Sequence, residues 1–271
     1  MSDTSSTSHS GAPGPMEAHL RAKRDSGKKL LVPYITGGFE GWEDAIRAAA
    51  DAGADAIEIG IPFSDPVMDG PVIQQASQAA LEGGATPASI LQAAPNLDTG
   101  IPLAVMTYYN IARHEGHERF ASRLADSGIA GAILPDLPLV ESGPWRESAA
   151  SAGIETIMLA APTTPDHRLA TLCEASHGFV YAVGLLGVTG ERAELADTAT
   201  KIAGRCKAVT DKPVLIGVGI GSPEQAVEAS TVADGVVIGS AVVRQLVDGH
   251  GPEGVGQLVA SYRAALDSRW S

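Results

Sequence analysis

The sequence predicts an α/β protein with a single closed (β/α)8 (TIM) barrel, extra helices and long active-site loops. Eight short β-prone runs alternate with helical segments along the chain. Most of these runs are continuously apolar, which is typical of parallel strands buried on both faces. The length of 271 residues is close to the ~250 residues that such a barrel fills as one domain. An open doubly wound sheet is the alternative, but eight units in this length favour closure.

The predicted strands are rich in aliphatic residues, and a segment with helix signals follows each of them. The longest connection joins the second and third strands and contains two predicted helices, residues 71–82 and 87–94. It leaves room for a long loop, and such loops after barrel strands often carry the substrate chemistry. The predicted strands are residues 30–36, 56–59, 103–107, 131–134, 155–159, 178–183, 214–218 and 235–238.

Start and stop signals place helices between these strands. Residues 16–29 form a basic amphipathic stretch before the first strand, and residues 45–54 are rich in alanine. Pro223 stands at a first helical position, where proline is favoured. Gly153 follows a helical segment immediately before the fifth strand, as expected for a helix C-terminus.

The N-terminal residues differ in composition from the rest of the chain. They are rich in Ser, Thr, Gly and Pro and lack the basic start and apolar stretch of a signal peptide. We expect residues 1–15 to be a disordered tail and residues 16–271 to be the catalytic barrel. Cys173 and Cys206 show no CxxC spacing, so we expect two reduced, packed thiols in a cytoplasmic protein.

The acidic composition excludes several classes of partner. The chain has 32 acidic and 19 basic side chains and a formal net charge of -13, which argues against a nucleic-acid-binding surface. No apolar run approaches the ~18 residues that a membrane helix requires. A small phosphorylated substrate stays compatible with this charge, because backbone amides can bind phosphate.

Glu58 is the one charged residue within the apolar run of the second predicted strand. Polar side chains near the C-terminal ends of barrel strands face the active site. Burial between Ile57 and Ile59 disfavours a charged carboxylate, so we expect the pKa of Glu58 to be raised. Such an acid suits proton transfer in catalysis. The alternative is a glutamate paired with an arginine from another layer of the barrel.

The loop after the second predicted strand presents Ser64, Asp65 and Asp69 among three prolines and two glycines. An aspartate beside proline or glycine often only stabilises a turn. Together with Glu58, however, Asp69 supplies the two differently solvated carboxylates that acid/base catalysis requires.

Glycine-rich segments follow the last three predicted strands and predict a phosphate site. Glycine lets backbone N–H groups approach an anion, and a helix starting after Gly239 and Ser240 directs its positive end there. The loops after strands seven and eight frequently bind phosphate in this fold. The alternative is that the glycines only allow helix and strand to pack closely. The segments are residues 187–190, 217–222 and 239–240.

The sequence lacks the residues that a Schiff-base, metal-dependent or dinucleotide-dependent enzyme would need. No lysine stands at the C-terminal end of a predicted strand, and Lys212 precedes the seventh, so a Schiff-base aldolase is disfavoured. His114 and His117 could share a helix face, where we expect an exposed polar pair and no metal site. The first strand–helix unit has no GxGxxG for a dinucleotide. Carboxylates acting on a phosphorylated substrate therefore remain.

Blocks of the sequence resemble the alpha subunit of tryptophan synthase, in the order of that family, from about Met16 to the end. The block from Glu58 to Gln74 is highly specific, whereas the short glycine motifs would be weak alone. The matching blocks are residues 33–38, 58–74, 106–110, 135–138, 187–190, 217–220, 222–225 and 239–241.

The resemblance implies a carbon–carbon lyase of aromatic amino-acid biosynthesis that cleaves indole-3-glycerol phosphate into indole and glyceraldehyde 3-phosphate. It implies no cofactor in this chain. It also implies a partner, the tryptophan synthase beta subunit, which carries pyridoxal phosphate and receives indole through a tunnel in an alpha2-beta2 heterotetramer. No nucleic acid or membrane is expected as a partner.

By the same resemblance, Glu58 matches the catalytic glutamate and Asp69 the loop aspartate of the family. Glu58 would protonate the ring carbon and accept the glyceryl hydroxyl proton, while Asp69 would hold the indole N–H. Thr189 matches a loop threonine that docks on the aspartate loop. The implied substrate contacts are Tyr34, Ile73, Tyr108, Tyr181, Thr189, Gly190, Gly219, Gly239 and Ser240.

Three other functions are compatible with a barrel of this kind. A phosphosugar isomerase or epimerase would need a smaller pocket than the long loop, Tyr108 and Tyr181 suggest. A non-catalytic regulatory subunit would be expected to lack the catalytic carboxylates, and both are present. A self-sufficient lyase that releases free indole would have the same sequence features as the heteromeric enzyme.

Overall fold

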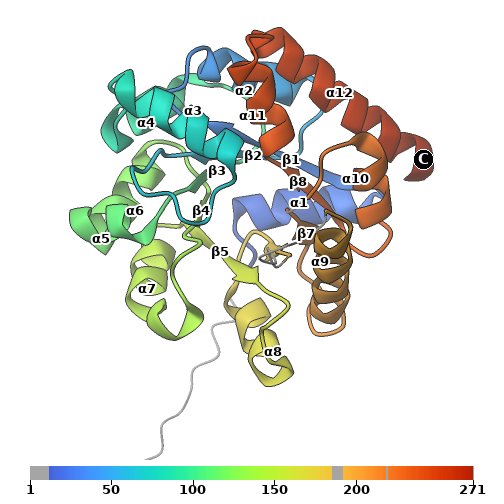
Figure 1. The fold of residues 1–271 in the computed structure, drawn as a ribbon. Coiled ribbons are helices and arrows are strands. Elements are labelled where there is room, and N and C mark those ends of the chain that lie inside the picture. The colour runs from blue at the N-terminus through green and yellow to red at the C-terminus, as the bar shows by residue number, and fades with distance from the viewer. Residues whose placement is uncertain (1–11, 185–191, 218, 271) are drawn as a thin grey trace, which may run out of the picture.

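The computed structural model describes residues 12–184, 192–217 and 219–270, with the backbone alone at 192–196. Within them, eight parallel strands pair in sequence order, and β8 pairs with β1 to close the barrel (Figure 1). The predicted (β/α)8 barrel is therefore confirmed. The strands are β1 Leu30–Thr36, β2 Ile57–Gly60, β3 Leu103–Met106, β4 Gly131–Ile133, β5 Glu155–Ala160, β6 Val180–Ala182, β7 Val214–Ile216 and β8 Gly235–Ile238.

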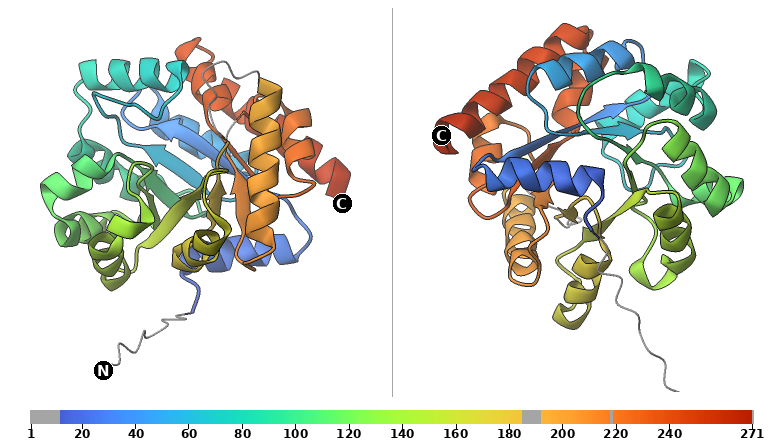
Figure 2. Two further views of the ribbon diagram at one scale, coloured as in Figure 1. Left: turned by 60° about the horizontal axis from the view of Figure 1, so that its bottom comes forward. Right: turned by 180° about the vertical axis from the view of Figure 1, so that it is seen from behind.

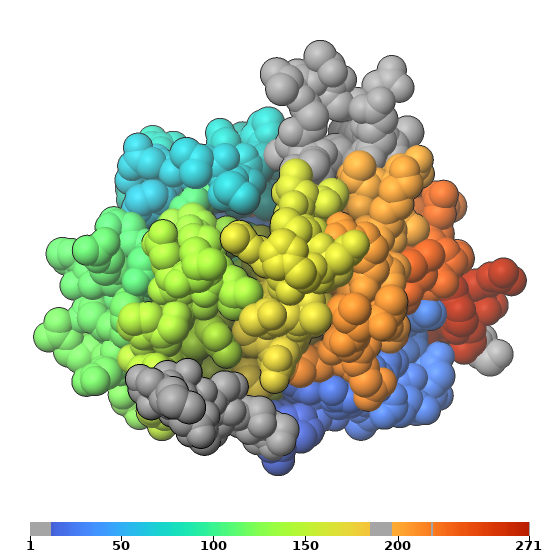
Figure 3. Space-filling view, turned by 90° about the horizontal axis from the view of Figure 1, so that it is seen from below, coloured from blue at the N-terminus to red at the C-terminus, as the bar shows by residue number. Residues whose placement is uncertain are grey.

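Helices surround the barrel, and the strand–helix units follow one another around the molecule in sequence order (Figures 2 and 3). The α-helices are α1 Pro15–Asp25, α2 Trp42–Asp51, α3 Pro71–Glu82, α4 Pro87–Ala93, α5 Tyr109–Glu115, α6 His117–Asp126, α7 Gly143–Ser151, α8 Asp166–Ala175, α9 Arg192–Lys207, α10 Pro223–Ala229, α11 Ser240–Val247 and α12 Gly251–Trp270. Two 3-10 helices are η1 Ala94–Asn96 and η2 Leu139–Glu141.

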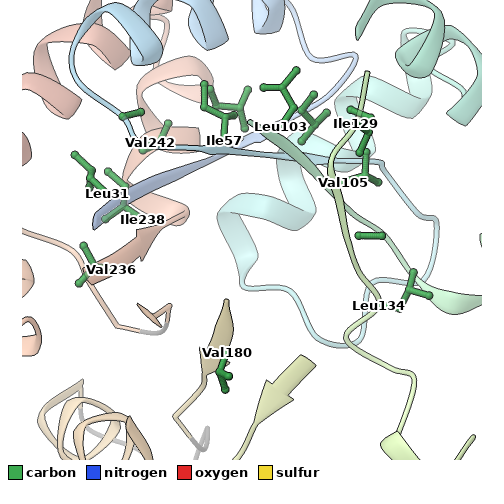
Figure 4. Packing of buried hydrophobic residues seen from close by; sticks show 14 of the residues in the cluster. Leu31, Ile57, Leu103, Val105, Ile129, Leu134, Val180, Val236, Ile238 and Val242 are labelled. Carbon is green, nitrogen blue, oxygen red and sulfur yellow. The ribbon is translucent and has the colours of Figure 1, made fainter. Parts of the chain in front are cut away.

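The apolar core of the described residues has two main parts, because successive strand residues point to opposite faces. One part lies between the barrel and its helices and includes Ile57, Val105 and Ile238 (Figure 4). The other fills the barrel interior. There Met16 and Leu20 of α1 pack against inward-facing strand residues, so that α1 closes the N-terminal end of the barrel. The opposite, C-terminal end is left for the site.

All eight predicted strands are present, and residues 30–36 and 235–238 match β1 and β8 at both ends. β6 is shorter than the predicted 178–183, because Gly178 has a positive φ and the chain turns there. Cys173 and Cys206 are buried free thiols, as predicted. No helix in the described ranges is long and apolar enough to cross a membrane.

His114 and His117 do not share a helix face, and of the expected exposed pair only His114 is exposed. Gly116 separates the two helices, so that His114 belongs to α5 and His117 begins α6. His117 is half-buried, and its Nε2 lies 2.9 Å from the Tyr109 hydroxyl.

Candidate active site

Glu58 occupies the inner face of β2, near the C-terminal end of the strand. Its neighbours Ile57 and Ile59 point outward into the core between barrel and helices, so the side chain of Glu58 points inward. It is 0% exposed. Neither carboxyl oxygen has a hydrogen-bond partner among the described residues. Burial raises the pKa of Glu58 to about 8. The predicted raised pKa is confirmed, and no arginine of the described chain pairs with this carboxyl group.

Two tyrosines lie close to the candidate acid. Tyr34 of β1 is in register with Glu58, and Tyr181 comes from β6 on the other side of the barrel. Burial raises the pKa of both phenols, and the nearby carboxylates Asp69 and Glu58 raise it further. Both phenols therefore stay neutral, and both lie within electrostatic range of the two carboxylates.

Each of these tyrosines lies over a glycine of a neighbouring strand or its loop. A Cβ atom at Gly60 would overlap the Tyr34 hydroxyl, and one at Gly217 would overlap the Tyr181 ring. Glycine at these two positions lets the rings lie flat across the barrel. The sequence pattern alone did not link Gly60 and Gly217 to these tyrosines.

Asp69 is held by Tyr108, which follows β3. The Tyr108 hydroxyl donates to Asp69 Oδ2 at 3.2 Å and accepts the Met68 N–H at 2.8 Å. The Phe63 ring stacks on Tyr108 with 5.0 Å between centroids. Burial raises the pKa of Asp69 above its usual value, and the hydrogen bond from Tyr108 offsets only part of that rise. Gln74 Nε2 donates to the Asp69 carbonyl at 2.8 Å. Tyr108 thus connects β3 to the loop that carries Asp69.

The start of α11 lies beside this loop. A Cβ atom at Gly239 would contact Ile73 Cδ1 at 3.6 Å and Tyr34 Cβ at 3.8 Å. One at Gly70 would lie 3.8 Å from Ser240 Oγ. The structure thus brings Tyr34, Ile73, Gly239 and Ser240 next to the Asp69 loop. The positive end of α11 is directed to this place.

The other predicted phosphate residues are only partly described. Gly219 is exposed with φ +81° and follows β7, the neighbour of β8. Thr189 and Gly190 lie outside the described residues.

A cavity of about 290 Å³ opens where β4 and β5 end. Nine of its ten lining residues have apolar side chains, and Asp136 is the only ionisable one among them. Its lining residues are Leu134, Pro135, Asp136, Leu137, Pro138, Leu139, Ile157, Met158, Leu159 and Leu172. The sequence analysis did not single out Asp136, although it lies in the matching block of residues 135–138.

The site lacks the donor set of a metal centre. In the described part of the chain, no group of three or more His, Cys, Asp or Glu side chains could hold a metal ion. What the geometry supplies is a neutral buried acid, a second carboxylate with a phenol partner, an apolar cavity and a helix start.

The comparisons with known proteins agree in sequence and in structure. The family model described as tryptophan synthase alpha chain matches residues 20–264. The tryptophan synthase alpha chain of Streptomyces coelicolor is 44% identical over 250 residues, covering 89% of this chain and 92% of the relative. That of Thermobifida fusca is 41% identical over 254 residues, covering 91% and 94%.

Solved structures give the same result. A structure of Mycobacterium tuberculosis tryptophan synthase in space group F222 matches with a TM-score of 0.86 and 36% identity, covering 94% of this chain and 99% of that one. The tryptophan synthase subunit alpha from Legionella pneumophila matches with a TM-score of 0.84 and 30% identity, covering 95% and 100%. The chain therefore belongs to the tryptophan synthase alpha chain family.

Proposed function

We propose that this chain is a carbon–carbon lyase that cleaves indole-3-glycerol phosphate into indole and glyceraldehyde 3-phosphate by acid/base catalysis. The observation that carries the proposal is Glu58, a fully buried carboxyl group without a hydrogen-bond partner in the described residues. With a pKa of about 8 it is largely protonated at neutral pH. Retro-aldol cleavage at an aromatic carbon requires such a proton donor.

Glu58 performs two proton transfers in this reaction. The acid protonates C3 of the indole ring, and its carboxylate then accepts the proton of the glyceryl hydroxyl next to the ring. The C–C bond breaks, its electron pair returns to the ring, and the hydroxyl carbon becomes the aldehyde of the second product. Protons balance, because the acid is restored. A pKa near neutrality suits a group that must act in both directions.

Asp69 stabilises the positive charge that the ring nitrogen acquires when C3 is protonated. For this it must be ionised and must point at the indole N–H. The Tyr108 hydroxyl, which donates to Asp69 Oδ2, favours the ionised form. The indole ring would lie against Tyr34, Tyr108 and Tyr181. The cavity at the ends of β4 and β5 includes none of these residues in its lining, but it opens at the same end of the barrel. The amides around Gly219, Gly239 and Ser240 would bind the phosphate, together with Thr189 and Gly190, which follow β6 in the sequence.

Membership of the family implies a beta subunit as partner. We propose an alpha2-beta2 heterotetramer in the cytoplasm, with pyridoxal phosphate in the beta subunit, which receives the indole. Val67 is 81% exposed and Val140 is 77% exposed. Val67 lies on the loop after β2 and Val140 in η2 after β4, both at the C-terminal end of the barrel, and such apolar side chains suit a surface that a partner covers.

One assay tests the proposed reaction. The purified chain is incubated with indole-3-glycerol phosphate, with and without its beta subunit, and indole is measured. We expect indole in both cases and a faster rate with the partner. Glu58→Gln is the control for contaminating activity. Absence of indole in both conditions contradicts the substrate assignment and returns the phosphosugar isomerase as the leading alternative.

A further inference from the structure

Asp136 lies in the loop after β4 and is exposed, yet its side chain reaches the neighbouring loop after β3. Its Oδ1 accepts the backbone N–H of Tyr109 at 2.8 Å. Tyr109 is the first residue of α5, and Tyr108 is the N-cap residue of that helix. One carboxylate thus ties the start of α5 to the end of β4.

The hydroxyl of Tyr108 both accepts and donates a hydrogen bond. It accepts the Met68 N–H, and its own proton is directed to Asp69 Oδ2. The Tyr108 side chain has few rotatable bonds, so the place of this hydroxyl depends on the backbone at residues 108 and 109. The hydrogen bond from Asp136 acts at that part of the backbone.

We propose that Asp136 is a positioning residue for the reaction: by holding the Tyr109 amide, it fixes the Tyr108 hydroxyl that orients Asp69. The inference rests on the proposed function, because it assigns Asp136 a place in the same site. Asp136 need not touch substrate to act in this way. Its effect passes through two hydrogen bonds and one peptide unit.

The pH dependence of the reaction separates this role from a simple charge effect. The titratable groups around Asp69 are Tyr34 of β1, Tyr108 after β3 and Tyr181 of β6, together with Glu58 of β2 and Asp65 on the same loop. The hydrogen bond from Tyr108 lowers the pKa of Asp69. Losing that bond therefore raises the pKa of Asp69. Losing a nearby negative charge would lower it.

The first test compares Asp136→Ala with Asp136→Asn, assayed as the complex with saturating beta subunit, so that weaker assembly does not lower the rate. For Asp136→Ala we expect kcat/KM to fall about tenfold and the acidic limb of its pH profile to move to higher pH. Asp136→Asn keeps an oxygen acceptor and should restore most of the rate. An acidic limb that moves to lower pH in both variants overturns the proposal in favour of a charge effect.

The second test is a double-mutant cycle with Tyr108→Phe. If Asp136 acts through the Tyr108 hydroxyl, Asp136→Ala should cost little more once that hydroxyl is gone. Losses that multiply in the double variant contradict the proposal. Glu141→Gln, which changes an exposed carboxylate of η2 in the same connection, is the matched control and should leave rate and pH profile unchanged.

Failure of this inference differs from failure of the proposed function. If the wild-type complex produces no indole, the reaction is wrong. If it produces indole and Asp136→Ala equals wild type in rate and pH profile, only the positioning role is wrong. The urea unfolding midpoint of each variant shows whether a lost rate reflects lost folding, which would not move the acidic limb.

Discussion

Buried carboxylates at the two ends of the barrel differ in their hydrogen-bond partners. At the N-terminal end, Glu155 Oε2 and Oε1 accept the Met16 and Glu17 N–H groups at 2.7 and 3.0 Å. Asp55 accepts the Leu31 N–H at 2.9 Å. At the C-terminal end, Glu58 is equally buried, and in the described residues neither of its oxygens has a partner.

This difference in hydrogen bonding matches a structural role for the carboxylates at the N-terminal end and the proposed catalytic role of Glu58. A buried carboxylate that accepts backbone N–H bonds recovers much of the cost of leaving water. Glu155 in addition caps α1, whose N-cap residue Gly14 has no side chain for that purpose. Glu58 accepts no hydrogen bond from the described residues, and burial raises its pKa to about 8. The same residue type is thus a structural cap at one end of the barrel and, by our proposal, a proton donor at the other.

The largest expected effect is on catalysis at the C-terminal end. Glu58→Gln keeps the shape of the side chain but removes its transferable proton, so kcat for indole formation should fall at least ~10³-fold. Calorimetric binding of indole-3-glycerol phosphate should change little, because the phosphate and ring contacts remain. A variant that keeps near-normal turnover contradicts the acid/base role of Glu58.

The same substitution should stabilise the fold at alkaline pH. The folded-state pKa of Glu58, about 8, lies above its unfolded value of 4.5. From pH 4.5 to 8 the unfolded chain releases a proton that the folded chain retains, so the stability of the wild type falls over this window. Glutamine has no proton to release, and at pH 8 Glu58→Gln should gain up to roughly 4 kcal/mol.

Urea unfolding at pH 5 and at pH 8 measures this effect. The two proteins should differ little at pH 5, and the variant should have the higher midpoint at pH 8. An equal difference at both pH values would mean that titration of Glu58 is not its source.

At the N-terminal end of the barrel, Glu155→Gln should lower stability and leave catalysis unchanged. Glu155→Gln leaves one of the two α1 N–H groups facing an amide NH2 instead of an oxygen, which should cost about 2 kcal/mol of unfolding free energy. We expect kcat to stay within about twofold of wild type, because Glu155 lies at the far end of the barrel. Glu147→Gln, on the exposed face of α7, is the control. A large loss of kcat in Glu155→Gln without a lower urea midpoint would contradict a purely structural role for Glu155.

The sequence predicted the barrel and Glu58 for the same reason: apolar runs mark buried strands, and a single charge within such a run stands out. Glu155 begins a strand after a helix stop, where a charged residue is unremarkable, so its role as the cap of α1 could not be predicted. The contact of Asp136 could not be predicted either, because its partner is a backbone amide after another strand. Pairings between distant loops depend on the closed barrel, and a local pattern does not contain them.

The smallest expected effect concerns the glycine at the start of α11. A Cβ atom at Gly239 would only touch Ile73 Cδ1 and Tyr34 Cβ at ordinary distances of 3.6 and 3.8 Å. The backbone there, with φ -108° and ψ -82°, lies outside the main regions of an L-residue, so Gly239→Ala should still fold but lose about 1–3 kcal/mol of unfolding free energy. If the amide binds phosphate, the added methyl group should raise KM about fivefold and leave kcat unchanged, which is the signature of lost uniform binding. Gly143→Ala at the start of α7, with open space around it, should change neither constant. An unchanged KM in Gly239→Ala would mean that this glycine serves packing, and that the C-terminal end of the barrel binds phosphate elsewhere.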